Sequence, residues 1–393
     1  MSRSRRIAIC AALVCLAGRA VAADPVEFRI GIISREIPPP AASDIEARPE
    51  DDGIAGGRLA IRDNNSTGAF TRQSYKAEEV ILEEGQSAGE AAKALVSGGT
   101  PFIVAALPAD DLLAVADALK DTPAVVFNAA AGEDRLRGPD CRANIFHVAP
   151  STAMLTDGLA QFLSHMRWRK LFLMVGPNEA DRLYAEAVKR SARKFGLQVT
   201  AERPWDLGPL ARAKADSPTT AEALVFTRGG DYDIAVVADE AGDFGDYVPF
   251  RTVDPRPVGG TQGLIATTWH PTLEAWGATQ AQNRFRRLAG RLMRPLDYQV
   301  WAAVRSVGEA GTQTKSADPR LVAAFLRSPD FSLPGHKGVG LSFRTWDQQL
   351  RQPILIVQPK ALVTVAPEKG FLHQRTPLDS LGLDQPESPC RLG

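Results

Sequence analysis

The stretch from Lys170 to Thr200 constrains the fold most, because it has the pattern of a strand, a helix and a second strand. Lys170 to Val175 is a short apolar run. Apolar residues then recur at the spacing of one helical face until Gly196 ends the pattern: Leu183, Tyr184, Ala187, Val188, Ala192 and Phe195. A crossover of this kind joins parallel strands. The turn from Gly176 to Asp181 should therefore lie at the carboxyl end of a parallel strand, where α/β sheets bind ligands.

Strand and helix signals alternate along most of the chain, which is typical of a parallel sheet covered by helices. The first series runs from a strand at Phe28 to Ser34 as far as a strand at Ala124 to Asn128, and the second begins after Val148. The chain has 393 residues, and single hydrophobic cores stop growing at about 250 to 300 residues. We therefore expect an α/β protein with two packed domains.

The N-terminus has the pattern of a secretory signal peptide over residues 1–23. A basic start precedes the apolar run Ile7 to Ala17, and small residues follow up to Ala23. The run is too short to span a bilayer, and no later segment approaches about 18 uninterrupted apolar residues, so we expect a soluble exported protein. Removing the signal takes away four arginines and leaves a formal net charge of about −4. Nothing in this charge favours binding to nucleic acid.

Cysteine usage predicts a disulfide bond between Cys141 and Cys390. The chain has four cysteines, of which Cys10 and Cys15 belong to the predicted signal peptide. The other two would then be alone in an oxidising compartment, where thiols pair. Two unrelated buried thiols are the alternative. A bond would fix the C-terminal tail, which is rich in proline and polar residues, to the middle of the chain.

An ordered set of segments resembles the periplasmic substrate-binding proteins of ABC transport systems, of the type that binds leucine, isoleucine and valine. The matching segments cover nearly all of the mature chain: Arg29 to Ile32, Gly56 to Asn65, Glu90 to Leu107, Asn144 to Pro150, Lys170 to Thr200 and Gly263 to Trp269. The resemblance implies the type I periplasmic binding protein fold, in which two Rossmann-like lobes with parallel central sheets are joined by a hinge of three crossings. It implies a ligand held in the cleft by hinge closure.

The same resemblance implies how the chain is divided between the lobes. The first lobe would take residues 24–148 and about 269–330, and the second about 149–268 and about 331–376, with a tail over 377–393. The implied role is capture and delivery of a solute, not catalysis, by a monomer in the periplasm. The implied partner is an ABC permease.

One loop departs from the pattern of the amino-acid binders. Those proteins carry a serine or threonine run after the strand that ends here at Phe127, which holds an α-carboxylate on backbone N–H groups. This chain has Asn128-Ala129-Ala130-Ala131-Gly132 instead. The departure argues against a plain amino acid, although a branched-chain amino acid or a short carboxylate stays an alternative ligand.

Within the family, the chain most resembles the subgroup associated with alcohol oxidation dependent on pyrroloquinoline quinone (PQQ). The segments that carry this resemblance are Arg29 to Arg35, Asn128 to Gly132, Cys141 to Asn144 and Tyr298 to Trp301. It implies a small anionic ligand, either PQQ itself or a small organic acid or alcohol-derived product. It also implies a PQQ-dependent dehydrogenase as an alternative partner.

A site for PQQ needs aromatic faces and several cations, because the quinone is planar and carries three carboxylates. Trp269 and Trp301 are the candidate faces, although tryptophan at helical spacing, as at Trp301, is also typical of a core. The candidate cationic groups are Arg35, Arg135 and Arg142, for which a surface position is the alternative.

Four further residues are candidates for ligand contact. Asn128 ends a first-lobe strand and Ala129 follows it, and for Asn128 the alternative is a turn-forming role. Tyr184 stands at the position of a family tyrosine that touches ligand, but it also lies on the apolar face of its helix. Asp239 follows the strand Ile234 to Ala238 and either reaches the cleft or is a solvated loop acid.

Other functional classes have weaker motifs. Gly85-Gln86-Ser87-Ala88-Gly89 matches the G-x-S-x-G of an esterase-like serine hydrolase, but Ser87 with Glu90 is also a helix capping box. Asp63 to Gly68 imitates the start of a calcium loop, yet Ser74 stands where that loop needs a bidentate glutamate. No phosphate loop, zinc spacing or paired-cysteine motif appears. A sensory or structural ectodomain that kept the fold is a further alternative.

Overall fold

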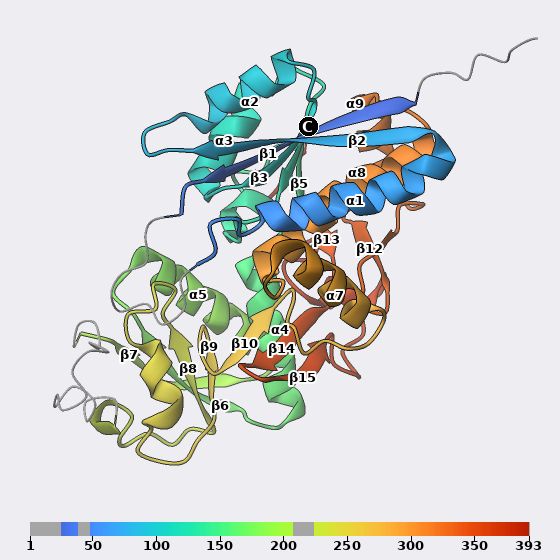
Figure 1. Ribbon diagram of the computed structural model, residues 1–393. Coiled ribbons are helices and arrows are strands. Elements are labelled where there is room, and N and C mark those ends of the chain that lie inside the picture. The colour runs from blue at the N-terminus through green and yellow to red at the C-terminus, as the bar shows by residue number, and fades with distance from the viewer. Residues whose placement is uncertain (1–24, 38–47, 207–223, 393) are drawn as a thin grey trace, which may run out of the picture.

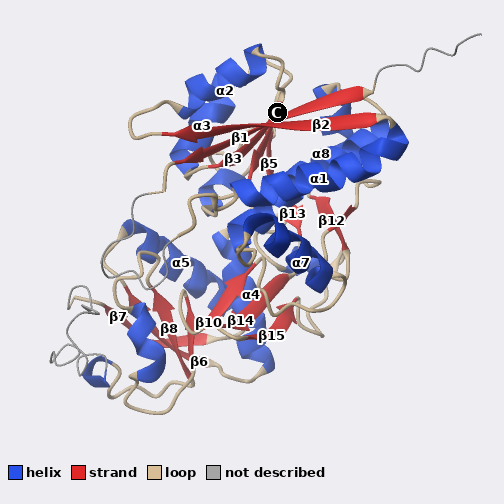
Figure 2. Ribbon diagram, in the orientation of Figure 1, coloured by secondary structure: helices blue, strands red, loops and turns tan. Residues whose placement is uncertain are grey.

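The computed structural model describes residues 25–37, 48–206 and 224–392. The predicted signal peptide lies outside the described residues. Two sheets form the centres of two lobes (Figure 1), and helices pack against each sheet (Figure 2). This arrangement confirms the expected α/β fold class. No helix in the described ranges is long and apolar enough to cross a membrane.

The first sheet has five parallel strands in the order β2-β1-β3-β4-β5. In chain order these are β1 (Val26–Arg35), β2 (Gln73–Leu82), β3 (Phe102–Ala106), β4 (Val125–Asn128) and β5 (Ile145–His147). Strands β3, β4 and β5 are nearly continuous runs of buried residues. Such runs are expected when both faces of a parallel sheet are covered.

Helices cover both faces of the first sheet. On one face lie α1 (Ile54–Thr71), α7 (Ala278–Ala289), α8 (Pro295–Thr314) and α9 (Pro319–Leu326), and on the other α2 (Ala88–Ser97) and α3 (Ala109–Ala118). Helices α1 and α8 pack closely because Gly56 has no side chain: a Cβ there would lie 1.9 Å from the Asp297 carbonyl oxygen.

The second sheet has seven strands in the order β15-β14-β10-β9-β8-β6-β7. Its strands are β6 (Lys170–Val175), β7 (Gln198–Pro204), β8 (Ile234–Ala238), β9 (Val258–Gly260), β10 (Leu264–Thr267), β14 (Ile354–Gln358) and β15 (Ala361–Ala366). Helices α4 (Thr152–His165) and α5 (Glu179–Lys194) pack together against one face. Strands β6 and β7 are parallel with α5 between them, which confirms the unit predicted from Lys170 to Thr200.

The second sheet is mixed, which corrects the expectation of purely parallel sheets. Strand β14 runs antiparallel to β10, and β15 runs antiparallel to β14. The physical reason for the reversal at β15 is the connection between β14 and β15, which is only two residues long. A two-residue link makes a hairpin, and parallel strands need a much longer crossover.

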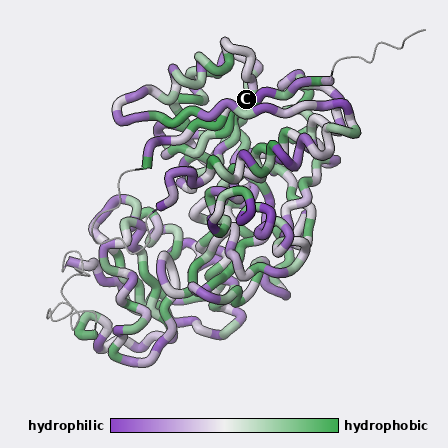
Figure 3. The backbone as a smooth tube through the Cα atoms, viewed as in Figure 1, coloured by the Kyte–Doolittle hydropathy of each residue, from purple (hydrophilic) through white to green (hydrophobic). Residues whose placement is uncertain are grey.

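The chain passes between the two lobes three times: after β5, after β10 and after α9. The third passage contains a small antiparallel sheet of β11 (Leu333–Pro334), β12 (Gly340–Phe343) and β13 (Leu350–Arg351). The hydropathy view shows apolar residues gathered along the strands (Figure 3). One cluster of buried side chains extends from the first sheet through α8 to Leu355 and Val357 of β14, so the hinge region is packed and not an open linker.

The C-terminal segment connects both lobes. A short 3₁₀ turn at Pro377–Ser380 puts Asp379 against Arg344 and Arg351, where all three side chains are largely buried. Further along, Ser388 donates its hydroxyl to the Arg137 carbonyl oxygen of the first lobe. The predicted disulfide bond between Cys141 and Cys390 is present. The tail is therefore a strap held by ion pairs at one end and by a covalent bond at the other.

Strand β2 forms one edge of the first sheet and carries charged side chains. Glu78 and Glu79 pair with Arg29 and Arg58, each at 2.6 Å. Lys76 pairs with Glu27, also at 2.6 Å. The edge is thus covered by three ion pairs, all of them at least partly open to solvent.

Candidate functional site

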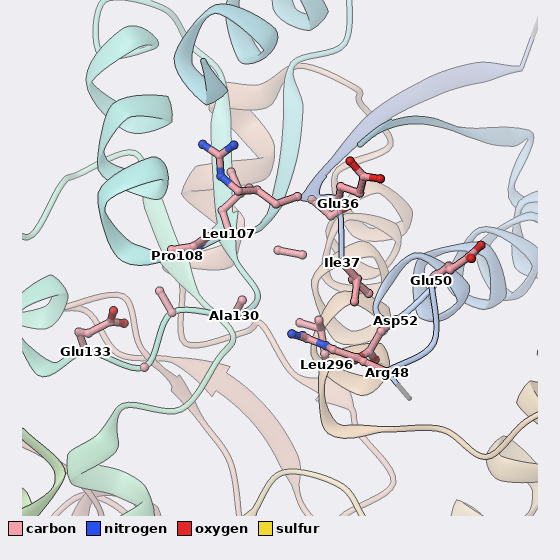
Figure 4. Close-up of a pocket in the computed structure, with 15 residues that line it drawn as sticks. Glu36, Ile37, Arg48, Glu50, Asp52, Leu107, Pro108, Ala130, Glu133 and Leu296 are labelled. Atoms are coloured by element: carbon pink, nitrogen blue, oxygen red, sulfur yellow. The ribbon is translucent and has the colours of Figure 1, made fainter. Parts of the chain in front are cut away.

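A pocket of about 330 Å³ lies at the carboxyl ends of β1, β3 and β4 (Figure 4). This is the edge of a parallel sheet at which α/β folds bind ligands. The walls come from the ends of the three strands, the segment after β1, the residues before α1 and the start of α8. The lining residues are Ser34, Arg35, Glu36, Ile37, Arg48, Glu50, Asp52, Ala106, Leu107, Pro108, Ala130, Ala131, Gly132, Glu133 and Leu296.

Asn128 builds one wall of this pocket by fixing the turn that follows β4. Its Oδ1 accepts the backbone N–H groups of Ala130 and Ala131 at 3.2 and 2.9 Å, and its Nδ2 donates to the Ala131 carbonyl oxygen at 2.7 Å. Asn128 and Ala129 are fully buried beneath the turn. The side chain thus performs the turn-forming role that was the alternative at this position, and Ala130 to Gly132 line the pocket instead.

Arg137, which the sequence did not single out, holds the same loop from behind. Its guanidinium donates to the carbonyl oxygens of Ala131, Glu133 and Ala149 at 2.9, 3.2 and 2.6 Å. Its Nε donates to the side-chain oxygen of Gln349. Burial lowers the pKa of Arg137 to about 10, so the group stays charged at neutral pH. The pocket loop is thereby tied to two of the passages between the lobes.

The two arginines in the pocket wall both have carboxylate partners. Arg35 donates from Nε and Nη2 to the two carboxylate oxygens of Asp111, at 2.5 and 2.7 Å. This hydrogen-bonded pair raises the pKa of Arg35. Arg48 donates to Asp52 at 3.0 Å, and Asp52 is almost completely buried. Among the described residues that line the pocket, no cation therefore lacks a carboxylate partner.

Across from the pocket, two acids organise the turns at the carboxyl ends of β6 and β8. Asp181 accepts the backbone N–H groups of Asn178 and Glu240 at 2.9 and 2.7 Å. Asp239 accepts three, from residues 243, 244 and 245. Both side chains are buried. Asp239 thus takes neither of the roles considered for it, because its carboxylate is used inside the protein to shape the turn.

Two glutamates from different lobes remain at the surface of the cleft. Glu133 lies at the rim of the pocket, on the opposite side from Arg48 and Asp52 (Figure 4). Glu240 follows β8 in the second lobe and is exposed to solvent. Partial burial of its carboxyl group raises the pKa of Glu240, and the charges of Asp181, Asp239 and Glu133 add to the rise. We call these two residues the acidic cleft.

The aromatic candidates lie in the protein core. Trp269 and Trp301 are 1% and 3% exposed and stack on either side of Tyr298. Their indole N–H groups donate to Gln282 and Asp63, at 3.1 and 3.0 Å. Tyr184 is 4% exposed and packs among the apolar side chains of α4 and α5. None of the three lines the pocket.

The other candidates lie apart from the cleft. Arg142 pairs with Asp117 at the amino-terminal edge of the first sheet, and Arg135 pairs with Asp110 and Asp140. Ser87 is exposed and accepts the backbone N–H of Glu90 at 3.3 Å, as a helix cap does. Of the eight predicted contact residues, the structure places only Arg35 in the pocket wall, with Asn128 and Ala129 directly behind it.

One protein family matches the chain over most of its length. A model of the family described as "Periplasmic binding protein" matches residues 83–362. No curated protein sequence matches the chain.

Solved structures of low sequence identity share the whole fold. A branched-chain amino acid ABC transporter periplasmic ligand-binding protein from Burkholderia xenovorans is 17% identical, with a TM-score of 0.73 over 93% of this chain and 99% of that one. A leucine-, isoleucine-, valine-, threonine- and alanine-binding protein from Brucella ovis, in a closed conformation, is 15% identical, with a TM-score of 0.67 over 94% and 100%. A solute-binding protein from R. palustris in complex with benzoate is 11% identical, with a TM-score of 0.65 over 93% and 99%.

Proposed function

Because the chain belongs to the periplasmic binding protein family, we propose that it captures a small organic solute between its lobes and delivers it to an ABC transporter. The protein would act as a monomer in the periplasm and would catalyse no reaction. Solute binding in such a fold needs a pocket at the carboxyl ends of the strands and a hinge that brings the second lobe over it. The pocket of about 330 Å³ and the three passages between the lobes supply these two parts.

The charge of the acidic cleft is the observation that supports a ligand class. Glu133 and Glu240 present carboxylates from both lobes, and the two arginines of the pocket are already paired with Asp111 and Asp52. Closure brings Glu133 and Glu240 together, which costs free energy unless a positive charge lies between them. A ligand that carries an ammonium group, such as an amino acid or an organic amine, would remove this cost.

The fit of PQQ to the same pocket is poor. A planar tricarboxylate needs a stacking face and several cations without partners. Trp269 and Trp301 are buried against Tyr298, and Arg142 lies at the other edge of the sheet. The branched-chain amino acid alternative, extended to other amines, is therefore the one that the geometry favours over the quinone and over small organic anions.

Isothermal titration calorimetry with a panel of ligands tests this proposal. Bound solute is first removed from the mature protein by partial unfolding and dialysis. The refolded protein is then titrated with leucine, a simple alkylamine, benzoate and PQQ. We expect saturable binding of at least one ligand with an ammonium group. Glu240→Gln should weaken that binding about tenfold, because one charged hydrogen bond or ion pair is lost in a partly enclosed site.

Glu84→Gln is the matched control, because it removes the same charge from an exposed position outside the cleft. It should leave the affinity unchanged. Binding of PQQ or benzoate with no binding of either amine would contradict the proposed ligand class and leave the transport role in place. The hydrolase alternative is tested separately: covalent labelling of Ser87 by a fluorophosphonate, detected by mass spectrometry, would overturn the binding-protein proposal itself.

A further inference from the structure

A second cavity lies at the edge of the first sheet opposite the acidic cleft. It measures about 370 Å³ and is formed by the amino ends of β4 and β5, the turn after α3 and one side of α9. Four cationic side chains from three separate segments line it: Lys120, Arg142, Arg320 and Arg327. We call this cavity, defined by these four residues, the basic groove.

Only one of the four cations has a carboxylate partner. Arg142 donates to Asp117 at 2.6 Å, and this hydrogen bond lowers the pKa of Asp117. Among the described residues, no carboxylate forms an ion pair with Lys120, Arg320 or Arg327. The basic groove therefore carries an excess of positive charge, whereas both arginines of the solute pocket, Arg35 and Arg48, have carboxylate partners.

The guanidinium of Arg327 is held in one orientation. Its Nε donates to the side-chain oxygen of Gln348 at 2.6 Å, and its Nη2 donates to the Ala143 carbonyl oxygen at 2.8 Å. The group also lies 5.1 Å from the centroid of the Phe146 ring. Gln348 is itself fully buried and bonded to β5 through the Ile145 carbonyl oxygen. A cation fixed in this way loses little side-chain entropy when it binds an anion.

Arg320 and Lys120 complete the groove from two sides. Arg320 comes from the first turn of α9 and Lys120 from the turn after α3, and both are exposed, so a solute can reach them. Thr122 and Asn144 add polar groups to the lining. A small anion with oxygen atoms on several sides matches cations that converge from separate segments.

We propose that the basic groove is a binding site for a small oxyanion with two or more negative charges. Phosphate and compact di- or tricarboxylates share this chemistry. The site is independent of the proposed solute pocket, since it lies at the other end of the strands and has the opposite charge. It would be occupied whether or not the cleft holds a ligand.

Titration of the mature protein with inorganic phosphate and, separately, with citrate tests the site, with calorimetry as the readout. We expect saturable binding of at least one of the two anions. The anion that binds more tightly shows whether the groove prefers a phosphate or a carboxylate ligand. Replacing Lys120 and Arg320 together by glutamine should weaken this binding about tenfold or more, because two charge-assisted contacts are lost. Both side chains are exposed and lie outside the core, so the variant should fold.

The control variant carries Arg286→Gln and Arg287→Gln, which remove two exposed positive charges from α7, outside the groove. It should bind the anion as the wild type does. Absence of saturation by both anions would overturn the proposal. So would an equal affinity in the groove variant and the wild type, because the anion would then be bound elsewhere.

Discussion

Replacing Cys141 and Cys390 together by serine should lower the free energy of unfolding substantially, because the bond between them closes a very long loop. The two residues are 249 positions apart in the sequence. In the loop-entropy description, a bond that closes a loop of this length constrains the unfolded chain by about 5 kcal/mol at 25 °C. That value is an upper estimate, since unfolded chains keep some residual structure.

The strap has anchors that do not depend on the disulfide bond. Asp379 keeps its ion pairs with Arg344 and Arg351 at 3.0 and 2.8 Å, and Ser380 still accepts a hydrogen bond from Gln161 at 2.9 Å. The serine variant should therefore fold, with the strap still docked on the second lobe. What it loses is the covalent link to the first lobe, so the two lobes should also unfold in more clearly separate steps.

Urea unfolding followed by circular dichroism measures this loss, and linear extrapolation gives the free energy. Wild-type protein unfolded in the presence of a thiol reductant is the control, and it should behave like the serine variant. A decrease of less than about 1 kcal/mol, below the roughly 2 to 5 kcal/mol that loss of a native disulfide typically costs, would refute the reasoning. It would mean that the disulfide bond restricts the unfolded chain very little.

Three further perturbations test the packing and the electrostatics. Asp379→Asn should destabilise the protein by about 3 to 5 kcal/mol in urea unfolding, because it removes the carboxylate shared by Arg351 and the buried Arg344, which keeps a longer ion pair with Asp347 at 3.9 Å. The raised pKa of Glu240 means that the folded state gains stability as pH falls through that pKa. Glu240→Gln should remove this contribution of Glu240 to the pH dependence of stability, and thermal melts of both proteins across this pH range measure it. Gly56→Ala should lower the free energy of unfolding by about 3 kcal/mol or more, because the new Cβ would overlap the Asp297 carbonyl oxygen. As a control, Ser66→Ala on the exposed side of the same helix should leave the melting temperature unchanged.

The local elements of the fold could be predicted because their signals lie within short stretches of sequence. In the unit from Lys170 to Thr200, the apolar period predicts the helix and Gly196 predicts its end. Both lie within about one helical turn of the bounds of α5 in the structure. The disulfide bond followed from counting cysteines. The hairpin of β14 and β15 also had a local signal, the two-residue link, which the expectation of parallel sheets overlooked.

The candidate site was harder to predict because partners distant in sequence decide each role. Trp301 donates to Asp63 across 238 positions, and Arg35 is bound by Asp111 across 76. No periodicity reveals such pairings, so a residue of suitable chemistry near a strand end can equally be core or structural. Glu133 and Glu240 were missed for the same reason: each is an ordinary loop acid until the two lobes are placed together.

The ion pairs along β2 also bear on how the protein behaves at high concentration. An edge strand exposes unpaired backbone groups that can recruit a strand from a second molecule. A second strand laid along β2 would have to displace or bury Lys76, Glu78 and Glu79 together with their partners, which is costly. The β2 edge of the first lobe is thereby protected from pairing with an edge strand of another copy of the chain.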